Sequence, residues 1–170
     1  MIDIQTILTY LTLISVPVGV TYHIMTLNNT RKNQQLQLET RQAQMYMSII
    51  NSFNSPEFRR QWHIVESATW DDYDDFHEKY PLGSEMLTAA TRHFIFFDSI
   101  GGLVKKKLID VDLIDGALAL NIVVTWRLLE DIIYGDRESF NTPSLWEPFE
   151  YIYNEISKRD EFKESTPFHR

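Results

Sequence analysis

The residues best suited to chemistry are carboxylates that gather in one short acidic run between Trp70 and Tyr80. The candidates for metal ligands in this run are Asp71, Asp74, Asp75, His77 and Glu78. On a helix the carboxylates share one face, and their oxygens together with an imidazole could hold a hard divalent cation. The run therefore raises the hypothesis of a metal-dependent enzyme.

The spacing of the run favours a simpler interpretation. A calcium loop needs alternating ligands around a central glycine, and a di-iron bundle needs Glu-x-x-His pairs; the sequence has neither. We interpret the run as a solvated acidic face whose aromatic residues, Trp70, Tyr73 and Phe76, turn inward. The sequence predicts no catalytic residue and no cofactor, and the metal site stays as the alternative.

The composition argues against several other classes of protein. The chain of 170 residues carries 24 acidic and 16 basic residues, for a formal net charge of −8. An acidic chain is poorly suited to neutralising phosphates, so we expect no nucleic-acid partner. Because cysteine is absent, a disulfide framework, a zinc finger and a cysteine nucleophile are all excluded.

The elements that must position these residues begin with an uncharged segment. Residues 4–27 are mostly apolar and long enough to cross a hydrocarbon core of about 30 Å as a helix. Asp3 precedes the segment, whereas Arg31 and Lys32 follow it, so the positive-inside tendency places the N-terminus outside and the remainder in the cytoplasm. We expect a single-pass protein of the cell (inner) membrane, with the lipid bilayer as a partner. The alternatives are a signal peptide, although no basic n-region precedes the segment, and a buried core helix.

The next segment, residues 28–54, is predicted to continue as a polar juxtamembrane stalk helix. Its apolar and small residues recur with a heptad spacing: Leu36, Ala43 and Ile50, each followed four residues later by Thr40, Met47 and Asn54. This spacing could form a short coiled-coil seam for self-association. Packing of the end of the stalk onto the body is the favoured interpretation.

Residues 55–160 are predicted to form a bundle of four or five antiparallel helices, and residues 161–170 a flexible tail. Ser55-Pro56-Glu57 is a strong helix start, and that helix should run to Pro81. Ser84 with Glu85 opens the next helix, which ends at the lysines of residues 105–107.

Two further helices complete the predicted bundle. Asp110 is the expected cap of one helix, and Gly135 is expected to stop it. Thr142 with Pro143 is expected to start the last helix. Since no segment shows the alternating pattern of a strand, the predicted fold class is all-α.

One stretch, Phe96 to Asp110, reads FFDSIGGLVKKKLID and is followed by Leu113-Ile114 and Trp126. These residues resemble those of a widespread prokaryotic family of small proteins of unknown function. Its members typically have one N-terminal membrane helix, a polar helical linker and a helical domain with an aromatic pair, an isoleucine-glycine step and a leucine-valine-lysine turn. The resemblance implies this architecture and no activity. Lys107 stands where glycine is common in that turn.

Gly101 and Gly102 lie inside a helical pattern, where each costs about 1 kcal/mol relative to alanine. Close packing against the fourth helix or the stalk would offset that cost. A phosphate-binding loop is the alternative, but the lysine-threonine ending and the preceding strand of such loops are missing.

Large aromatic residues complete the candidate surfaces. Trp126 and Trp146 join Gly101 and Gly102 as candidates for packing or interaction, because exposed rings would mark a contact patch. The sequence predicts an uncharacterised single-pass membrane protein whose cytoplasmic helical domain mediates protein–protein interaction or scaffolding, with an unknown protein or a second copy as partner. A membrane-tethered metal-dependent enzyme that uses the acidic cluster from Asp71 to Glu78 is the alternative.

Overall fold

The computed structural model describes residues 3–114 and 116–159, apart from the side chain of Thr12, and this part of the chain is all-α. The tail predicted over residues 161–170, and residue 160 at the end of the predicted bundle, lie outside the described residues. The chain divides into two compact units, residues 1–43 and residues 44–170.

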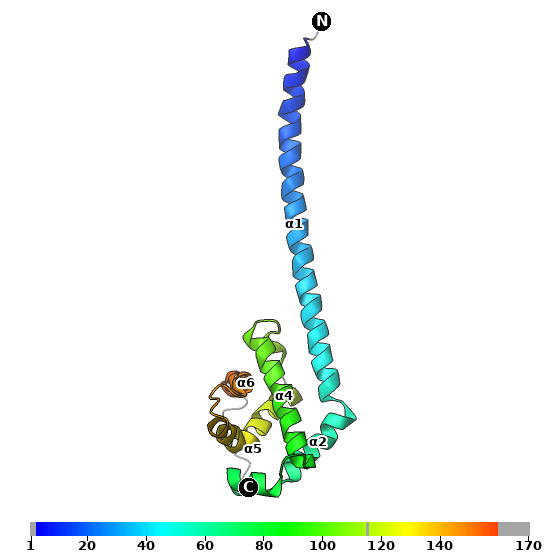
Figure 1. The fold of residues 1–170 in the computed structure, drawn as a ribbon. Helices are drawn as coiled ribbons and strands as arrows, with labels where there is room; N and C mark the ends of the chain where they lie inside the picture. The colour runs from blue at the N-terminus through cyan, green and yellow to red at the C-terminus, as the bar shows by residue number, and fades with distance from the viewer. Residues whose placement is uncertain (1–2, 115, 160–170) are drawn as a thin grey trace. The chain divides into compact units, whose positions relative to one another are not determined.

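The first element is one uninterrupted helix, α1 (Ile4–Phe53), drawn from blue to cyan in Figure 1. The segment predicted to span the membrane and the segment predicted as a stalk are consecutive parts of this helix. Its continuity follows from the sequence, since no glycine or proline occurs between residues 28 and 53. Helix α1 supplies the whole helical part of the first unit and the first ten residues of the second.

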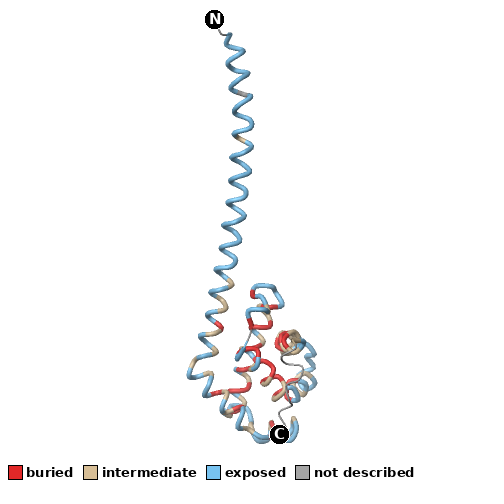
Figure 2. Tube along the Cα trace, turned by 180° about the vertical axis from the view of Figure 1, so that it is seen from behind, coloured by how far each residue is buried: buried red, intermediate tan, exposed pale blue. Residues whose placement is uncertain are grey.

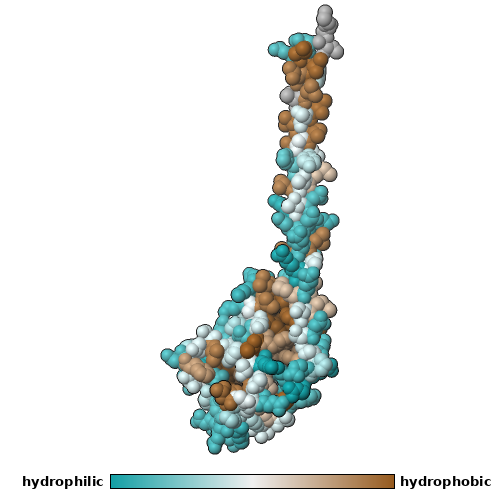
Figure 3. All heavy atoms as spheres, turned by 45° about the vertical axis from the view of Figure 1, so that its right-hand side comes forward, coloured by the Kyte–Doolittle hydropathy of each residue, from teal (hydrophilic) through white to brown (hydrophobic). Residues whose placement is uncertain are grey.

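The apolar side chains of the first unit are exposed. Among the described residues, α1 is the one helix long and apolar enough to cross a membrane, and none of its most apolar 18-residue window is buried. Figure 2 shows this unit almost entirely in the colour of exposed residues, and Figure 3 shows the apolar side chains that it presents. The apolar segment is therefore no part of the hydrophobic core in the described structure, which argues against the buried-helix alternative.

In its described residues the second unit, which we call the body, contains five further α-helices and one short 3₁₀ helix. Their bounds are α2 (Pro56–Ser67), α3 (Tyr73–Lys79), α4 (Glu85–Lys105), η1 (Val111–Leu113), α5 (Gly116–Ser139) and α6 (Glu147–Ser157). The most extensive contact joins α4 to α6, and α2 packs on α4 while α5 packs on α6 (Figure 1). The core lies among these helices, with Phe97, Trp126 and Phe149 fully buried.

The end of α1 belongs to this core. Ile49 is buried, and Met45, Ile50 and Phe53 pack against it while staying partly exposed. The ring centroids of Phe53 and Phe58 are 5.3 Å apart, which links α1 to α2.

Two helix starts are as the sequence predicts. The Ser55 side chain accepts a hydrogen bond from the backbone N–H of Phe58, and the Ser84 side chain accepts one from Leu87. Both serines therefore satisfy an amide that the first turn of α2 or α4 leaves without a helical partner.

The helix predicted from Pro56 to Pro81 is instead two helices. The chain leaves α2 after Ser67, and α3 begins after Asp72, whose side chain accepts a hydrogen bond from the backbone N–H of Asp75. Between them Trp70 is buried, and its indole N–H donates to Asp131 at 3.0 Å. The cap formed by Asp72 and the burial of Trp70 therefore divide the segment into two helices, although its apolar residues recur with helical spacing throughout.

The last two helices also differ from the prediction. Asp110 caps η1 instead of a long helix, and α5 runs through Gly135 to Ser139. Gly135 is needed for packing, because a Cβ there would overlap the ring of Tyr73. Helix α5 ends where Asn141 takes a left-handed conformation, and α6 begins at Glu147, five residues after the predicted start.

Candidate functional site

The acidic run is used mainly to build the start of α3. Asp75 accepts hydrogen bonds from the backbone N–H of Asp71 at 2.8 Å and from the Lys79 ammonium at 2.8 Å. The bond from Lys79 and then the bond from Asp71 hold the pKa of Asp75 below its ordinary value. Asp74 and Glu78 are exposed. The carboxylate of Asp75 is thus already engaged by groups at the start of α3 and within it.

His77 is turned away from those carboxylates and toward α5. Its ring lies 4.4 Å from that of Tyr73, and its Nε2 atom is 3.6 Å from a carboxylate oxygen of Asp136. Within residues 3–114 and 116–159, no group of three or more His, Cys, Asp or Glu side chains is arranged to hold a metal ion. The structure therefore joins His77 to a residue outside the predicted ligand set.

Asp136 is the buried carboxylate of this cluster. Only 14 % of its side chain is exposed, and it accepts a hydrogen bond from the Tyr73 hydroxyl at 3.2 Å. Burial raises the pKa of Asp136, while the hydroxyl of Tyr73 and the neighbouring His77 act in the opposite direction. A carboxylate whose pKa is raised by burial and which lines a surface groove is a common feature of functional sites.

A groove of about 740 Å³ opens beside His77 and Asp136. Its size falls within the range of ligand and peptide sites, about 300–1,000 Å³. One wall comes from the turn before α4 and the first half of α4, and the other from the segment between α5 and α6. The lining residues used below are Leu82, Arg92, Asp136, Phe140, Leu145 and Trp146. We call this the α4–α5/α6 groove.

Two large apolar side chains stand exposed at the groove. Leu82 is 96 % exposed and Phe140 is 66 % exposed, although both are apolar and the body has a well-formed core. Single exposed apolar residues are ordinary, but two that line the same groove form an apolar patch. This is the feature of the body that most resembles a contact surface.

The wall between α5 and α6 is held in an unusual backbone conformation. Asn141 and Trp146 have φ values of +48° and +58°, in the left-handed region that side chains other than glycine rarely adopt. Arg137 fixes this segment, since its Nε–H donates to the carbonyl of Leu145 at 2.8 Å and its guanidinium pairs with Glu150 at 2.8 Å. Strained positions of this kind collect at binding sites.

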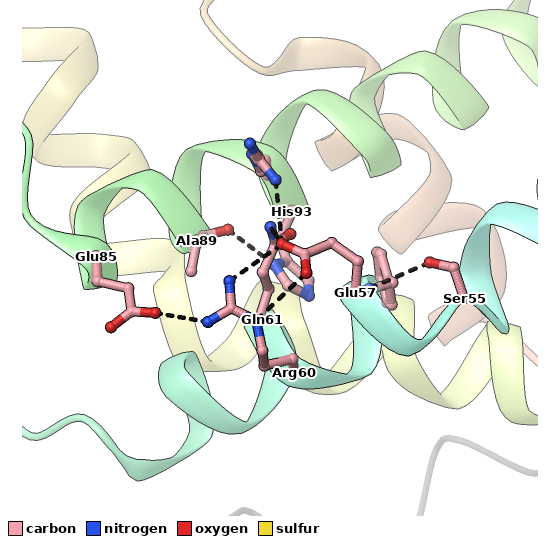
Figure 4. Close-up of polar contacts among 9 residues, drawn as sticks. Ser55, Glu57, Arg60, Gln61, Glu85, Ala89 and His93 are labelled. Atoms are coloured by element: carbon pink, nitrogen blue, oxygen red, sulfur yellow. Dashed lines mark hydrogen bonds and ion pairs between the residues drawn. The ribbon is translucent and has the colours of Figure 1, made fainter.

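A second polar cluster joins α2 to α4, and Figure 4 shows it in close-up. Glu57 accepts hydrogen bonds from Arg60, Gln61 and Arg92, and Arg60 also donates to Glu85 at 2.7 Å. The hydrogen bond from Arg60 is the main cause that lowers the pKa of Glu57. These charged groups pair with one another, so the cluster links α2 to α4. We interpret it as a structural contact between the two helices.

His93 lies beside this cluster in the interior. Its Nδ1 atom is 2.8 Å from the carbonyl oxygen of Ala89, and its ring packs 4.5 Å from Phe58 and 5.7 Å from Trp62. The residue is fully buried, and burial lowers its pKa. His93 is a neutral core residue between α2 and α4.

The glycine pair of the FFDSIGG stretch has two different surroundings. A Cβ at Gly101 would overlap the backbone carbonyl of Pro148, whereas a Cβ at Gly102 would meet nothing within 4 Å. Asp98 accepts a hydrogen bond from the backbone N–H of Phe149 at 3.3 Å. The close approach expected at Gly101 therefore occurs against α6, not against the fourth helix or the stalk.

The two tryptophans singled out in the sequence lie in different places. Trp126 is 1 % exposed and stacks on Tyr153 in the core, so its role is packing. Trp146 is partly buried against Phe94 and lines the groove.

Sequence reasoning missed Leu82, Asp136 and Phe140. Leu82 follows Pro81 in the predicted turn between two helices, and nothing in the sequence marks Phe140 as a site residue. No spacing in the sequence joins these residues, because the groove forms only when the segment after α5 folds back beside α4.

The fold and the groove define a class of all-α protein: a helical body with a surface groove that follows a long, partly apolar N-terminal helix. The chain belongs to the family described as "Domain of unknown function (DUF4760)", whose model matches residues 2–156. The predicted membership of an uncharacterised family is thus confirmed. No curated protein and no solved structure matches the chain.

Proposed function

We propose that the protein is anchored in a membrane by the apolar part of α1. The supporting observation is that the apolar side chains of this helix are exposed along residues 4–27, while the body buries a core of its own. Polar groups in the segment are compatible with lipid. The Thr9 and Thr21 hydroxyls donate to the carbonyls of Gln5 and Pro17, one turn earlier in the helix.

The orientation that we propose places the N-terminus outside and the body in the cytoplasm, at the cell (inner) membrane. Arg31, Lys32 and Arg41 follow the apolar segment, and basic residues close to a span stay on the cytoplasmic side.

Because the chain lacks cysteine, single cysteines can test this topology. We expect Asp3→Cys to react with a membrane-impermeant maleimide on intact cells, and Lys106→Cys to react only after permeabilisation. Carbonate extraction should leave both variants in the membrane, and the intact mass should include residues 4–27. Release by carbonate, or loss of that segment by cleavage, would contradict the anchor, and reversed labelling would contradict the orientation alone.

We further propose that the body binds another protein through the α4–α5/α6 groove. The observation that carries this proposal is that Leu82 and Phe140 are exposed on the two walls of one groove, and that Arg137 pins the wall to which Phe140 belongs. Large apolar side chains at a concave surface are typical anchors of protein contacts. The expected partner segment presents an apolar side chain to the groove.

A photo-crosslinking amino acid at position 140 tests the binding site in cells. We expect it to yield a discrete adduct, which identifies the partner by mass. Leu82→Asp should reduce that adduct about tenfold or more, as loss of a contact anchor does. The matched control is the same photo-crosslinker at Ile95, which is 52 % exposed and lies outside the groove lining. Equal adducts from both positions would contradict a groove-specific partner.

A further inference from the structure

A second stripe of mostly apolar or small residues runs along α1, on the side away from the residues that pack into the body. Met45, Ile49 and Phe53 contact the core, whereas Met47 in the same stretch is 53 % exposed. At about 100° per residue, Met47 lies about 160° around the helix from Ile49. The core therefore uses one side of α1 and leaves another side uncovered.

The uncovered stripe continues toward the N-terminus with a regular spacing. Alternate steps of four and three residues back from Met47 reach Ala43, Thr40 and Leu36, all of which are exposed, with Leu36 at 51 %. This alternation is the 3.5-residue period that keeps one side of a helix against a coiled-coil partner. We call these four residues the outer stripe.

The same steps pass Asn33, Asn29, Thr26 and Tyr22 before they reach Gly19 and Ser15 in the apolar segment. Small residues four positions apart let two helices approach closely in lipid. The residues between Leu36 and Gly19 are mostly polar, so the outer stripe is the part of this side best suited to a partner helix.

The polar part of α1 carries apolar side chains that are exposed. Leu36, Ala43 and Met47 are exposed, and a helix gains little stability from an apolar face that no other element covers. Burial of Leu36, Ala43 and Met47 against a second helix would supply that stabilising apolar contact.

We propose that a second copy of this chain covers the outer stripe in a parallel, two-stranded arrangement. The proposal rests on the membrane anchor proposed above, since a span gives both copies one direction and brings each stripe residue opposite its equivalent. The flanking charges permit this arrangement. In a parallel pair Lys32 faces Gln37 of the second copy and Glu39 faces Gln44, so no like charges meet.

Cysteine scanning of the full chain in native membranes tests the arrangement. A disulfide forms only where two Cα atoms come within about 7 Å, so we expect Leu36→Cys to give about tenfold more disulfide-linked dimer than Leu38→Cys under mild oxidation. Leu38 is the matched control: it is also a leucine, it is 61 % exposed, and it lies outside the stripe. Ala43→Cys should crosslink like Leu36→Cys.

Three outcomes would overturn the proposal: equal crosslinking at positions 36 and 38, a dimer signal that disappears when the protein is expressed at low level, or no crosslink at either stripe position despite full labelling by maleimide. Failure of the dimer proposal can be distinguished from failure of the groove and anchor proposals. Leu82→Asp should reduce the groove adduct formed from position 140 without changing the crosslink at position 36, and carbonate extraction reports on the anchor alone.

Discussion

Lys107 adopts a backbone conformation that usually requires glycine. Its φ is +57°, and it lies just after α4, where the backbone N–H of Leu108 donates to Leu103 and that of Lys107 donates to Val104. This is the Schellman arrangement, in which a left-handed residue closes the helix. Lys107 therefore occupies the position of this turn that favours glycine, and the lysine is strained there.

We expect Lys107→Gly to stabilise the protein by about 1 kcal/mol, because a left-handed residue other than glycine costs about 1–2 kcal/mol. Chemical denaturation of the full chain in detergent measures the difference. Lys106→Gly is the control, since Lys106 has φ −82° and should gain nothing. A larger gain at position 106 than at 107 would contradict the assignment of strain.

His93 makes the stability of the body depend on pH. Because burial holds the folded-state pKa of His93 below its ordinary value of about 6.5, the unfolded chain binds the proton more readily. The contribution is therefore complete above about pH 6.5 and is lost as the pH falls from there through the folded-state pKa. Denaturation midpoints measured across this window should decline toward acid.

The variant His93→Gln isolates this effect. Glutamine keeps a polar side chain at the position but does not titrate, so the stability of the wild type should fall relative to that of the variant as the pH drops below about 6.5. Parallel pH profiles for the two proteins would show that other groups cause the acid sensitivity.

At the scale of elements, the contact between α4 and α6 depends on one glycine of a pair. Gly101→Ala should cost about 2–3 kcal/mol, because the new Cβ overlaps backbone of α6 that cannot move cheaply. Gly102→Ala should instead stabilise by about 1 kcal/mol through helix propensity, since its surroundings are open. Unfolding of the two variants under one condition gives the comparison, and equal effects would contradict it.

The sequence predicts elements well where a local signal agrees with the packing. The caps at Ser55 and Ser84 and the all-α class follow from local chemistry, and the structure contains them. Gly135 misled the prediction because its missing side chain makes room for Tyr73 instead of ending α5. The true end of α5 uses Asn141, which carries no strong stop signal.

The candidate site was less predictable than the fold. The sequence marks His77 as a candidate ligand because it lies in the acidic run. Its neighbour in the structure, Asp136, is 59 residues further along the chain. Proximity of that kind depends on how α3 and α5 pack, which periodicity does not encode. The acidic run suggested a metal site because the carboxylates that cap helices and those that bind metals belong to the same residue types.

At the scale of the whole molecule, the division into two units predicts where the chain can be cut. A protein that starts at Gln44 should fold and stay soluble without detergent, because the apolar segment is gone while the packing of Ile49 and Phe53 remains. A protein that starts at Ser55 should lose roughly 3 kcal/mol, since that apolar contact is removed. Thermal melts and size-exclusion chromatography of both would check this. Equal stability would show that the end of α1 contributes nothing to the core.

The buried guanidinium of Arg137 also bears on how fast a partner could be captured or released. It fixes the carbonyl of Leu145 and the carboxylate of Glu150, so one wall of the groove is ordered before anything binds. Little conformational entropy then remains to be lost in that wall on association. Association would then require no rearrangement of this segment. Substitutions at Leu82 or Phe140 would chiefly change the dissociation rate of a complex.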